Sequence, residues 1–264
     1  MLLVSKLVSQ SSAMITVWVH GTNPPPSLLL MSYYSPLRPW LYAKPGLSLA
    51  LELPVHYYFH RLAKSCHEAD PIEFPCDCFY TYGWPSTVLS AKTRQYEGIQ
   101  LFCGIDAIVR QYRKKFDEVK VRVIGFSHGG NIILNMIQCL PFFCKNTELD
   151  VVFLGIPVQE LTRSFINNAW VNRAFSFYSD ADWMQVMDIQ KMANWGDNVP
   201  WFSKKIFQDD DQIVQIKLTI NGKSIGHREY RSYNQYVPYL LKSVKSLMSD
   251  NQKNGYFSLD FSTE

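Results

Sequence analysis

The stretch VIGFSHGGN, residues 123–131, decides the fold that the sequence predicts. It contains the pattern G-x-S-x-G, with Gly125 two residues before Ser127 and Gly129 two residues after it. A β-branched run precedes the pattern and an almost wholly apolar run follows it, which predicts a strand, a very tight turn and a helix. Glycines suit such a turn because the serine adopts a strained backbone and its neighbours leave no room for side chains. We therefore expect Ser127 to stand above a sheet, at the N-terminal end of a helix.

Strands and helices alternate along the chain on both sides of this motif. β-Branched or aromatic runs predict strands at 14–20, 76–81, 120–125, 151–154, 173–178 and 213–220. Apolar residues at helical spacing predict helices at 47–64, 90–115, 131–140 and 237–247. This alternation predicts an α/β fold with a mainly parallel central sheet of about six strands and helices on both faces. Chemistry is then expected at the carboxyl ends of the strands.

Length and composition favour one folded domain. Of the 264 residues, 47% are hydrophobic and 19% are charged, which is enough apolar material for a sizeable core. We expect a single domain over residues 1–250 and a polar, poorly ordered tail over residues 251–264. Residues 24–74 interrupt the alternation with prolines, leucines and aromatic residues. This insertion has two equally weighted interpretations, a cap or lid over the site and a simple extension of the core.

Charge and motifs argue against several classes of partner and cofactor. Lys and Arg number 26 and Asp and Glu 23, and a net charge of +3 is too weak to indicate nucleic-acid binding. No nucleotide-binding glycine motif occurs, so no cofactor is expected. His56 and His60 stand four residues apart, but the glutamate of the H-E-x-x-H pattern is missing, so no metal is expected.

The chain carries no pattern that predicts a membrane segment. No run of ~18 apolar residues occurs, and residues 1–13 lack the features of an ordinary secretory signal. The six cysteines show no C-x-x-C spacing and suit buried thiols in a reducing compartment. We therefore expect a cytoplasmic protein, while a non-standard route of secretion stays open.

A serine hydroxyl becomes a good nucleophile only with a histidine base and an acid that orients it. His227 is the histidine that follows the predicted nucleophile helix, in a glycine-bearing loop, and we expect it to be the base. Asp180 and Asp182 follow the predicted strand 173–178, and both are candidates for the acid. More remote candidates are Asp188 and the run 209–211, which is more simply a solvated turn.

These residues together resemble the α/β-hydrolase superfamily, and within it bacterial lipase- and esterase-like members. The resemblance extends from residue 14 to about residue 247 and is carried by VWVHGT (17–22), FYTYGW (79–84), GFSHGGN (125–131), FLGIPV (153–158), YSDAD (178–182) and GH (226–227). It implies the order serine, acid, histidine, and its Tyr-Ser-x-x-Asp pattern favours Asp182 as the acid. It also implies that the backbone amides of Thr22 and His128 form the oxyanion hole, with His20 ordering the loop.

The resemblance implies a serine ester hydrolase, and the aromatic surplus favours a small-molecule or lipid ester with an apolar acyl group. Trp84 and Phe126 are candidates for the substrate pocket, with core packing an equal interpretation of Trp84. An amphipathic insertion predicts transient contact with a lipid surface. Two alternatives stay open: a thioesterase or acyltransferase that uses the same residues, and a non-catalytic protein of this fold that binds a hydrophobic ligand or a partner.

Overall fold

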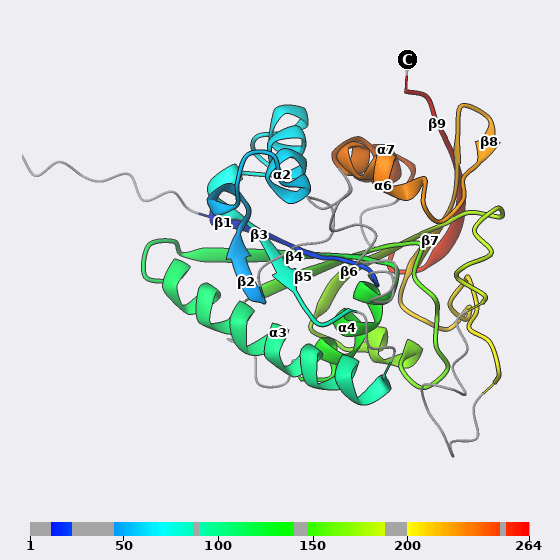
Figure 1. Cartoon of the computed structure of the whole chain (residues 1–264), viewed down its shortest axis with the longest axis horizontal. Coiled ribbons are helices and arrows are strands. Elements are labelled where there is room, and N and C mark those ends of the chain that lie inside the picture. The colour runs from blue at the N-terminus through cyan, green and yellow to red at the C-terminus, as the bar shows by residue number, and fades with distance from the viewer. Residues whose placement is uncertain are drawn as a thin grey trace, which may run out of the picture.

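One sheet organises the molecule (Figure 1). The computed structural model describes residues 12–22, 45–86, 90–139, 147–187, 200–248 and 252–263. The strands of these residues are β1 (Ser12–Val19), β2 (Gly46–Leu49), β3 (Phe79–Gly83), β4 (Glu118–Phe126), β5 (Thr147–Leu154), β6 (Val171–Tyr178), β7 (Val214–Ile220), β8 (Lys223–Ser224) and β9 (Gly255–Phe261). Their order is β2-β3-β1-β4-β5-β6-β7-β8, and β9 pairs with β7.

Most neighbouring strands of this sheet are parallel. β2 and β8 are the antiparallel members, against β3 and β7 respectively. The expected fold class, a mainly parallel sheet with helices on both faces, is therefore confirmed, although the described residues form nine strands where about six were expected. The register places Val19 beside Gly125 and Gly125 beside Phe153, so the loops after β1, β4 and β5 begin at one edge of the sheet.

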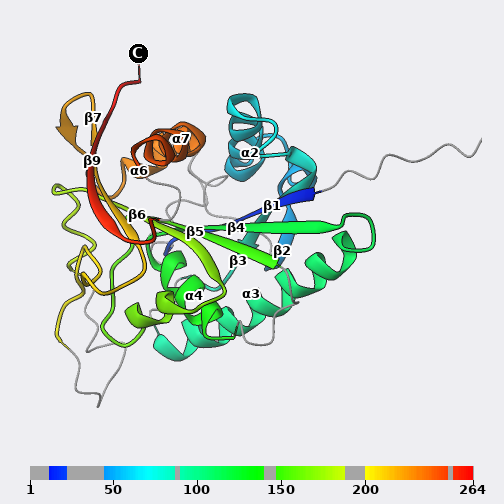
Figure 2. The same ribbon diagram turned by 180° about the vertical axis from the view of Figure 1, so that it is seen from behind.

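Helices cover both faces of the sheet (Figures 1 and 2). One face carries α3 (Ala91–Tyr112) and α4 (His128–Ile137), and the other carries α2 (Tyr58–Ala69), α6 (Tyr230–Tyr233) and α7 (Val237–Leu247). Because side chains alternate along a strand, each face has its own core: Val17 and Val19 of β1 join the first, and Trp18 joins the second. No helix of the described residues is both long enough and apolar enough to cross a lipid bilayer.

The helix expected over residues 47–64 is wrong. Residues 46–49 form the edge strand β2, a single 3-10 turn follows, and α2 begins only at Tyr58. Pro54 explains the break, because a residue before proline avoids the helical region, and Leu53 is extended with ψ 150°. α2 buries Phe59 and Leu62 in the core. Residues 45–74 therefore extend the core, and residues 23–44, where the expected lid would have to be, lie outside the described residues.

The tail expected over residues 251–264 is also wrong as a description of the C-terminus. Residues 255–261 form β9, which pairs in parallel with the whole of β7. Its side chains alternate between half-buried and exposed, and the half-buried Phe257, Leu259 and Phe261 pack against the core on the α2 and α7 side. The physical reason is a period of two in this short stretch, which the polar residues before it obscure in the sequence.

Candidate active site

Ser127 occupies the tight turn between β4 and α4. Its backbone has φ 53° and ψ −133°, a conformation that residues other than glycine rarely adopt. A Cβ atom on Gly125 would lie 2.7 Å from the Cα of Gly130, and one on Gly129 would lie 2.4 Å from the Val19 carbonyl oxygen. Both neighbours must therefore be glycine, because the turn presses the start of α4 against the ends of β1 and β4.

Three side chains predicted from the sequence meet at this edge of the sheet. His227 Nε2 lies 2.9 Å from Ser127 Oγ, and His227 Nδ1 lies 2.8 Å from Asp182 Oδ2. Because a carboxylate only accepts hydrogen bonds, Nδ1 carries the proton, which leaves the lone pair of Nε2 facing the serine hydroxyl. Asp182 is fully buried, while the His227 side chain is 11% exposed. The arrangement can accept a proton from Ser127 and stabilise the resulting imidazolium.

The loop after β6 holds Asp182 in place and turns Asp180 away. The Asp182 amide donates to the Ser179 carbonyl at 3.1 Å, and Asp182 Oδ1 accepts from the Gln185 amide at 3.3 Å. Asp180, by contrast, is exposed and pairs with Lys217. Of the two candidates for the acid in this loop, Asp182 therefore contacts His227 and Asp180 does not.

The two more remote acid candidates do not enter the described site. Asp188 lies outside the described residues. Asp211, in the run 209–211, is buried and accepts two hydrogen bonds from Arg163, at 3.1 and 3.2 Å. It also accepts from the Gln208 amide at 2.9 Å. The run was expected to be a solvated turn, but its residue Asp211 is buried and holds the turn in place through these hydrogen bonds.

Two aromatic rings and one serine fix the loop that carries His227. The Phe126 ring stacks on the imidazole at a centroid distance of 5.0 Å, and Tyr230 approaches it edge-on at 6.5 Å. Burial, together with the charge of Asp182, raises the pKa of Tyr230 well above its usual value, so the phenol stays neutral beside the acid. Ser179 Oγ accepts a hydrogen bond from the Ile225 amide at 2.9 Å and so ties the histidine loop to the acid loop.

The loop after β1 lies against Ser127. A Cβ atom on Gly21 would lie 2.8 Å from Ser127 Cβ, so only a glycine lets this loop pass. Thr22 follows that glycine, and His128 is the first residue of α4. The backbone amide of Thr22 therefore belongs to the residue after Gly21, which contacts Ser127. The backbone amide of His128 belongs to the residue after Ser127 and lies at the positive end of the helix dipole of α4.

His20 and Trp84, whose rings stack at a centroid distance of 5.9 Å, both hydrogen-bond to the backbone of this loop. His20 Nδ1 donates to the Gly21 carbonyl at 2.7 Å, and Trp84 Nε1 donates to the His20 carbonyl at 2.8 Å. Burial lowers the pKa of His20 to about 4; the Gly21 hydrogen bond opposes this and the charge of Arg231 adds to it, so His20 is neutral near pH 7. Trp84 is buried in the core beside the loop, whereas Phe126 lines a cavity next to Ser127.

The histidines of α2 point to backbone carbonyls. His60 Nδ1 lies 2.9 Å from the Leu53 carbonyl oxygen, and His67 Nδ1 lies 3.1 Å from that of Phe74. Within the described ranges, no three side chains of the metal-binding types stand close enough together to hold an ion.

Sequence reasoning missed four residues around the site: Ser179, Tyr230, Arg231 and Asn234. Tyr230 and Arg231 follow His227 by three and four residues, so a short helix after the base was the signal that would have placed them near it. Ser179 lies within the recognised acid motif, but its contact with the Ile225 amide depends on a distant loop. No local pattern marks such a contact.

The chain matches no protein-family model and no curated protein. Among solved structures, it is similar to a Staphylococcus aureus protein assigned as an esterase, at 11% identity and a TM-score of 0.38, covering 96% of this chain and 69% of that one. A metagenome-derived lipolytic enzyme from a study of LipS and LipT is 10% identical with a TM-score of 0.30, covering 96% and 84%. A mutant of the rice cell-wall-degrading esterase LipA from Xanthomonas oryzae is 7% identical with a TM-score of 0.33, covering 96% and 76%. Likenesses this low carry no argument about the chemistry, which rests on the geometry of the site.

Proposed function

We propose that this chain is a serine hydrolase of the α/β-hydrolase fold that cleaves carboxylic esters through an acyl-enzyme on Ser127. The observation that carries the proposal is the pair of hydrogen bonds that joins Ser127 to His227 and His227 to Asp182. The strained backbone of Ser127 supports it as well. Such strain costs about 1–3 kcal/mol and is typical of functional sites, whereas a serine in an ordinary turn has no reason to bear it.

In the proposed acylation step, Ser127 Oγ attacks the ester carbonyl carbon while its proton passes to His227 Nε2. The Asp182 carboxylate accepts the Nδ1 hydrogen bond and so stabilises the imidazolium. The tetrahedral intermediate collapses as the carbon–oxygen bond to the alcohol breaks, and His227 returns the proton to the departing alkoxide. The acyl group is then bound to Ser127 as an ester.

In the proposed deacylation step, a water molecule gives a proton to His227 Nε2 as its oxygen attacks the acyl carbon. Ser127 leaves with that proton, and the carboxylic acid is released. We assign the backbone amides of Thr22 and His128 to the oxyanion that forms in both steps. Removing one such donor typically costs about 2.7–4 kcal/mol of transition-state stabilisation, which is why the close passage of Gly21 over Ser127 matters.

For the substrate we propose an ester with an apolar acyl part. Phe126, the residue before the nucleophile, both stacks on His227 and lines the adjoining cavity. Its ring is buried and is an apolar group in direct contact with His227, the proposed base. Trp84 donates a hydrogen bond to the His20 carbonyl, and we assign it to holding the β1 loop.

Labelling with a fluorophosphonate tests the proposal. The activated serine forms a phosphorus–oxygen bond and expels fluoride, so we expect wild type to label and Ser127→Ala not to label. Asp182→Asn should lower kcat for 4-nitrophenyl butyrate by on the order of ten-thousandfold, because the amide favours the wrong imidazole tautomer. Asp180→Asn is the matched control, since it alters the exposed neighbour in the same loop and should leave the rate unchanged.

The opposite results would support a non-catalytic binding protein of this fold. Absence of labelling in folded wild type would contradict the hydrolase proposal. Equal labelling of Ser127→Ala, or equal loss of rate in Asp180→Asn and Asp182→Asn, would contradict the residue assignments. Circular dichroism and thermal melting of each variant separate loss of chemistry from loss of fold.

A further inference from the structure

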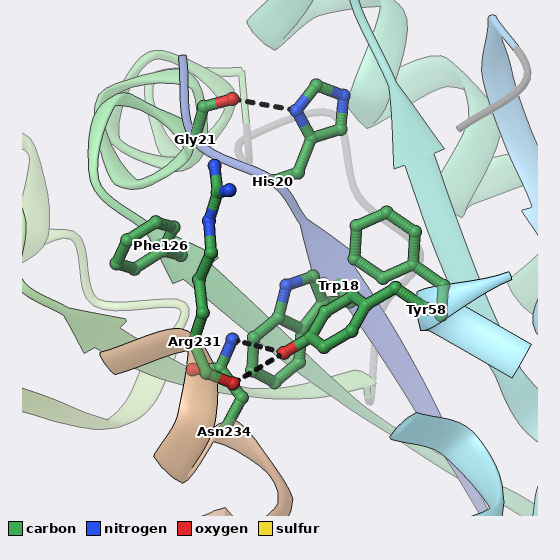
Figure 3. Close-up of a pocket in the computed structure, with 8 residues that line it drawn as sticks. Trp18, His20, Gly21, Tyr58, Phe126, Arg231 and Asn234 are labelled. Carbon is green, nitrogen blue, oxygen red and sulfur yellow. Dashed lines mark hydrogen bonds between the residues drawn. The ribbon is translucent and has the colours of Figure 1, made fainter. Parts of the chain in front are cut away.

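A cavity of about 20 Å³ is enclosed by residues of β1 and the loop after it, the start of α2, the end of β4, and α6 with the turn that follows it (Figure 3). Gly21 and Phe126 both line this cavity. Gly21 lies against Ser127, and Phe126 precedes Ser127 in the chain. The remaining walls are aromatic and polar: Trp18, His20, Tyr58, Phe59, Arg231 and Asn234. The volume holds one water-sized group, so an acyl chain does not fit inside it, whereas an anionic group at its opening can place one oxygen in it and keep the other outside.

Arg231 is the charged residue of this cavity. Its side chain runs from α6 past Trp18 and Phe126, and its guanidinium points toward Gly21 (Figure 3). The residue is half-buried. Burial lowers its pKa, Tyr58 opposes this, and the nearby charge of Arg228 lowers it further, yet an arginine stays protonated at physiological pH.

No carboxylate of the described residues pairs with Arg231. The residue takes part in no ion pair there, and the guanidinium donates no hydrogen bond to the described part of the chain. Its backbone carbonyl accepts from the Tyr58 hydroxyl at 3.2 Å, a contact that anchors the backbone and does not involve the guanidinium. Residues 23–44, which connect the β1 loop to β2, contain no Asp or Glu.

A half-buried cation without an anion is costly, because desolvation is offset only when an opposite charge or several hydrogen bonds face it. Asp182, the buried carboxylate of the site, is already bonded to His227. The Arg231 guanidinium therefore has no carboxylate partner among the described residues, and it points toward Gly21, which lies against Ser127 (Figure 3).

We propose that Arg231 binds an anionic group of the substrate, a carboxylate or a phosphate, beside the ester that Ser127 attacks. This inference rests on the proposed ester hydrolysis and narrows its substrate to esters that combine an apolar part with a negative charge. The planar guanidinium fork suits two oxygens of one carboxylate or phosphate, which also fixes the orientation of the ester. Arg231 is on this account a specificity-determining residue, distinct from the amides that face the oxyanion.

Paired esters test the inference and distinguish the two sides of the ester bond. On the acyl side, mono-4-nitrophenyl glutarate is compared with 4-nitrophenyl pentanoate; on the alcohol side, 1-butyrylglycerol 3-phosphate is compared with 1-butyrylglycerol. We expect wild type to prefer the anionic member of at least one pair in kcat/KM. Arg231→Gln should lower that preference by about tenfold to a hundredfold, the loss expected for a charged hydrogen-bonded contact.

Two variants control for general effects of charge. Arg228→Gln removes an exposed cation near the same helix and should leave the preference unchanged. Arg231→Lys keeps the charge but loses the fork, and should restore only part of the preference. An equal preference for neutral and anionic esters in wild type would overturn the inference, as would an equal loss in Arg228→Gln. A uniform fall in rate for every ester in Arg231→Gln would also overturn it, because it would place Arg231 at the oxyanion instead.

A measurement on wild type alone covers the case in which Arg231 variants do not fold. Glutarate should inhibit hydrolysis of whichever neutral ester is cleaved, competitively, and its diamide glutaramide should not; equal inhibition by both, or by neither, overturns the inference. Failure of the hydrolase proposal looks different, since then no ester is cleaved and the fluorophosphonate does not label Ser127.

Discussion

Ser179 shows how one residue sets the relative positions of Asp182 and His227, two of the three proposed catalytic side chains. It is buried at the end of β6, its carbonyl accepts from the Asp182 amide, and its hydroxyl accepts from the Ile225 amide two residues before His227. The loop that carries Asp182 and the loop that carries His227 are therefore both hydrogen-bonded to Ser179. Their relative position depends on a hydrogen bond whose loss leaves a buried N–H without a partner.

We predict that Ser179→Ala lowers kcat about tenfold and leaves KM within about twofold, because the residue positions the base and does not touch substrate. The free energy of unfolding should fall by about 1–3 kcal/mol, the cost of the unsatisfied amide. Steady-state kinetics and urea unfolding measure the two effects. Ser176→Ala is the matched control, since Ser176 is equally buried in β6 but its hydroxyl has no hydrogen-bond partner among the described residues. A wild-type kcat in Ser179→Ala would show that the contact is structural only.

At the residue scale, local pattern predicted Ser127 and left the acid to be decided in three dimensions. The glycines around Ser127 mark it because the turn is impossible without them. Asp180 and Asp182 share one loop and one residue type, and only the direction in which each side chain points separates them. The sequence also did not single out Arg231, because the absence of a carboxylate partner among the described residues depends on which side chains surround it in space.

Two helical glycines show what packing demands of an element. A Cβ atom on Gly129 in α4 would lie 2.4 Å from the Val19 carbonyl oxygen and 2.6 Å from that of His20, both backbone atoms that cannot move alone. A Cβ atom on Gly104 in α3 would meet only the end of the Leu47 side chain, at 2.6 Å, and that end can rotate. Replacement of glycine by alanine is therefore expected to lower the free energy of unfolding in α4 and not to lower it in α3.

We predict that Gly129→Ala lowers the free energy of unfolding by more than about 2 kcal/mol and abolishes fluorophosphonate labelling, because α4 moves away from β1. Gly104→Ala should change stability by between zero and a gain of about 1 kcal/mol, since alanine favours a helix interior over glycine. Chemical unfolding and labelling of both variants measure this. Equal stability of the two variants would contradict the packing argument.

A charged cluster joins the segment after α2 and the helix α7 to the sheet. Arg122 in β4, almost fully buried, donates to the Glu73 carbonyl at 3.0 Å and also bonds its carboxylate, and Lys245 of α7 lies 3.4 Å from the same carboxylate. The Arg122 guanidinium stacks over the Phe74 ring at 4.6 Å. Burial raises the pKa of Glu73, but the hydrogen bond and charge of Arg122, with help from Lys245, outweigh it and leave the pKa lowered.

We predict a pH dependence of stability from this cluster. Because the folded pKa of Glu73 lies below its value in the unfolded chain, the stabilisation is complete above about pH 4.5 and disappears as the pH falls through the folded pKa. Glu73→Gln should cost about 1–3 kcal/mol at pH 7 and make stability less sensitive to pH below 4.5. Urea unfolding between pH 7 and 3.5 measures this, with the exposed Glu68→Gln as control. Identical pH slopes in wild type and Glu73→Gln would refute the coupling.

At the element scale, the sequence predicted long amphipathic helices well and short edge elements badly. The helix expected over 90–115 is α3, residues 91–112, because an apolar stripe sustained over many turns fits no strand. The helix expected over 47–64 begins with leucines at 47, 49 and 51, a spacing of two that suits the strand β2 equally. The stretch forms a strand because β2 can pair with the free edge of β3, and the availability of that edge depends on the tertiary structure.

At the scale of the whole molecule, the sheet includes a strand, β9, in a stretch whose polar composition predicted a tail. β9 covers the edge of β7 that would otherwise be unpaired, and three of its side chains add to the core beside α7. The Thr219 hydroxyl and the Gly222 amide both donate to Asp260 at 2.8 Å, which locks the end of β7 to the end of β9. The stretch FSLDF, residues 257–261, alternates apolar and polar residues, but five residues after a polar run are too few to separate a strand from a tail without a sheet edge to receive them.

We predict that truncation after residue 250 lowers the free energy of unfolding by roughly 3 kcal/mol, about 1 kcal/mol for each of the half-buried Phe257, Leu259 and Phe261. The bare edge of β7 should also make the truncated protein aggregate, since an unpaired strand edge is a template for pairing. Its labelling by fluorophosphonate at low temperature should persist, because the Ser179 and Asp182 contacts that position His227 do not involve β9. Calorimetry, light scattering and labelling measure the three effects. Leu259→Asp, on the core side, should reproduce the loss of stability, whereas Ser258→Asp, on the exposed side, should not; equal melting temperatures for the two would mean that β9 contributes pairing alone and no core.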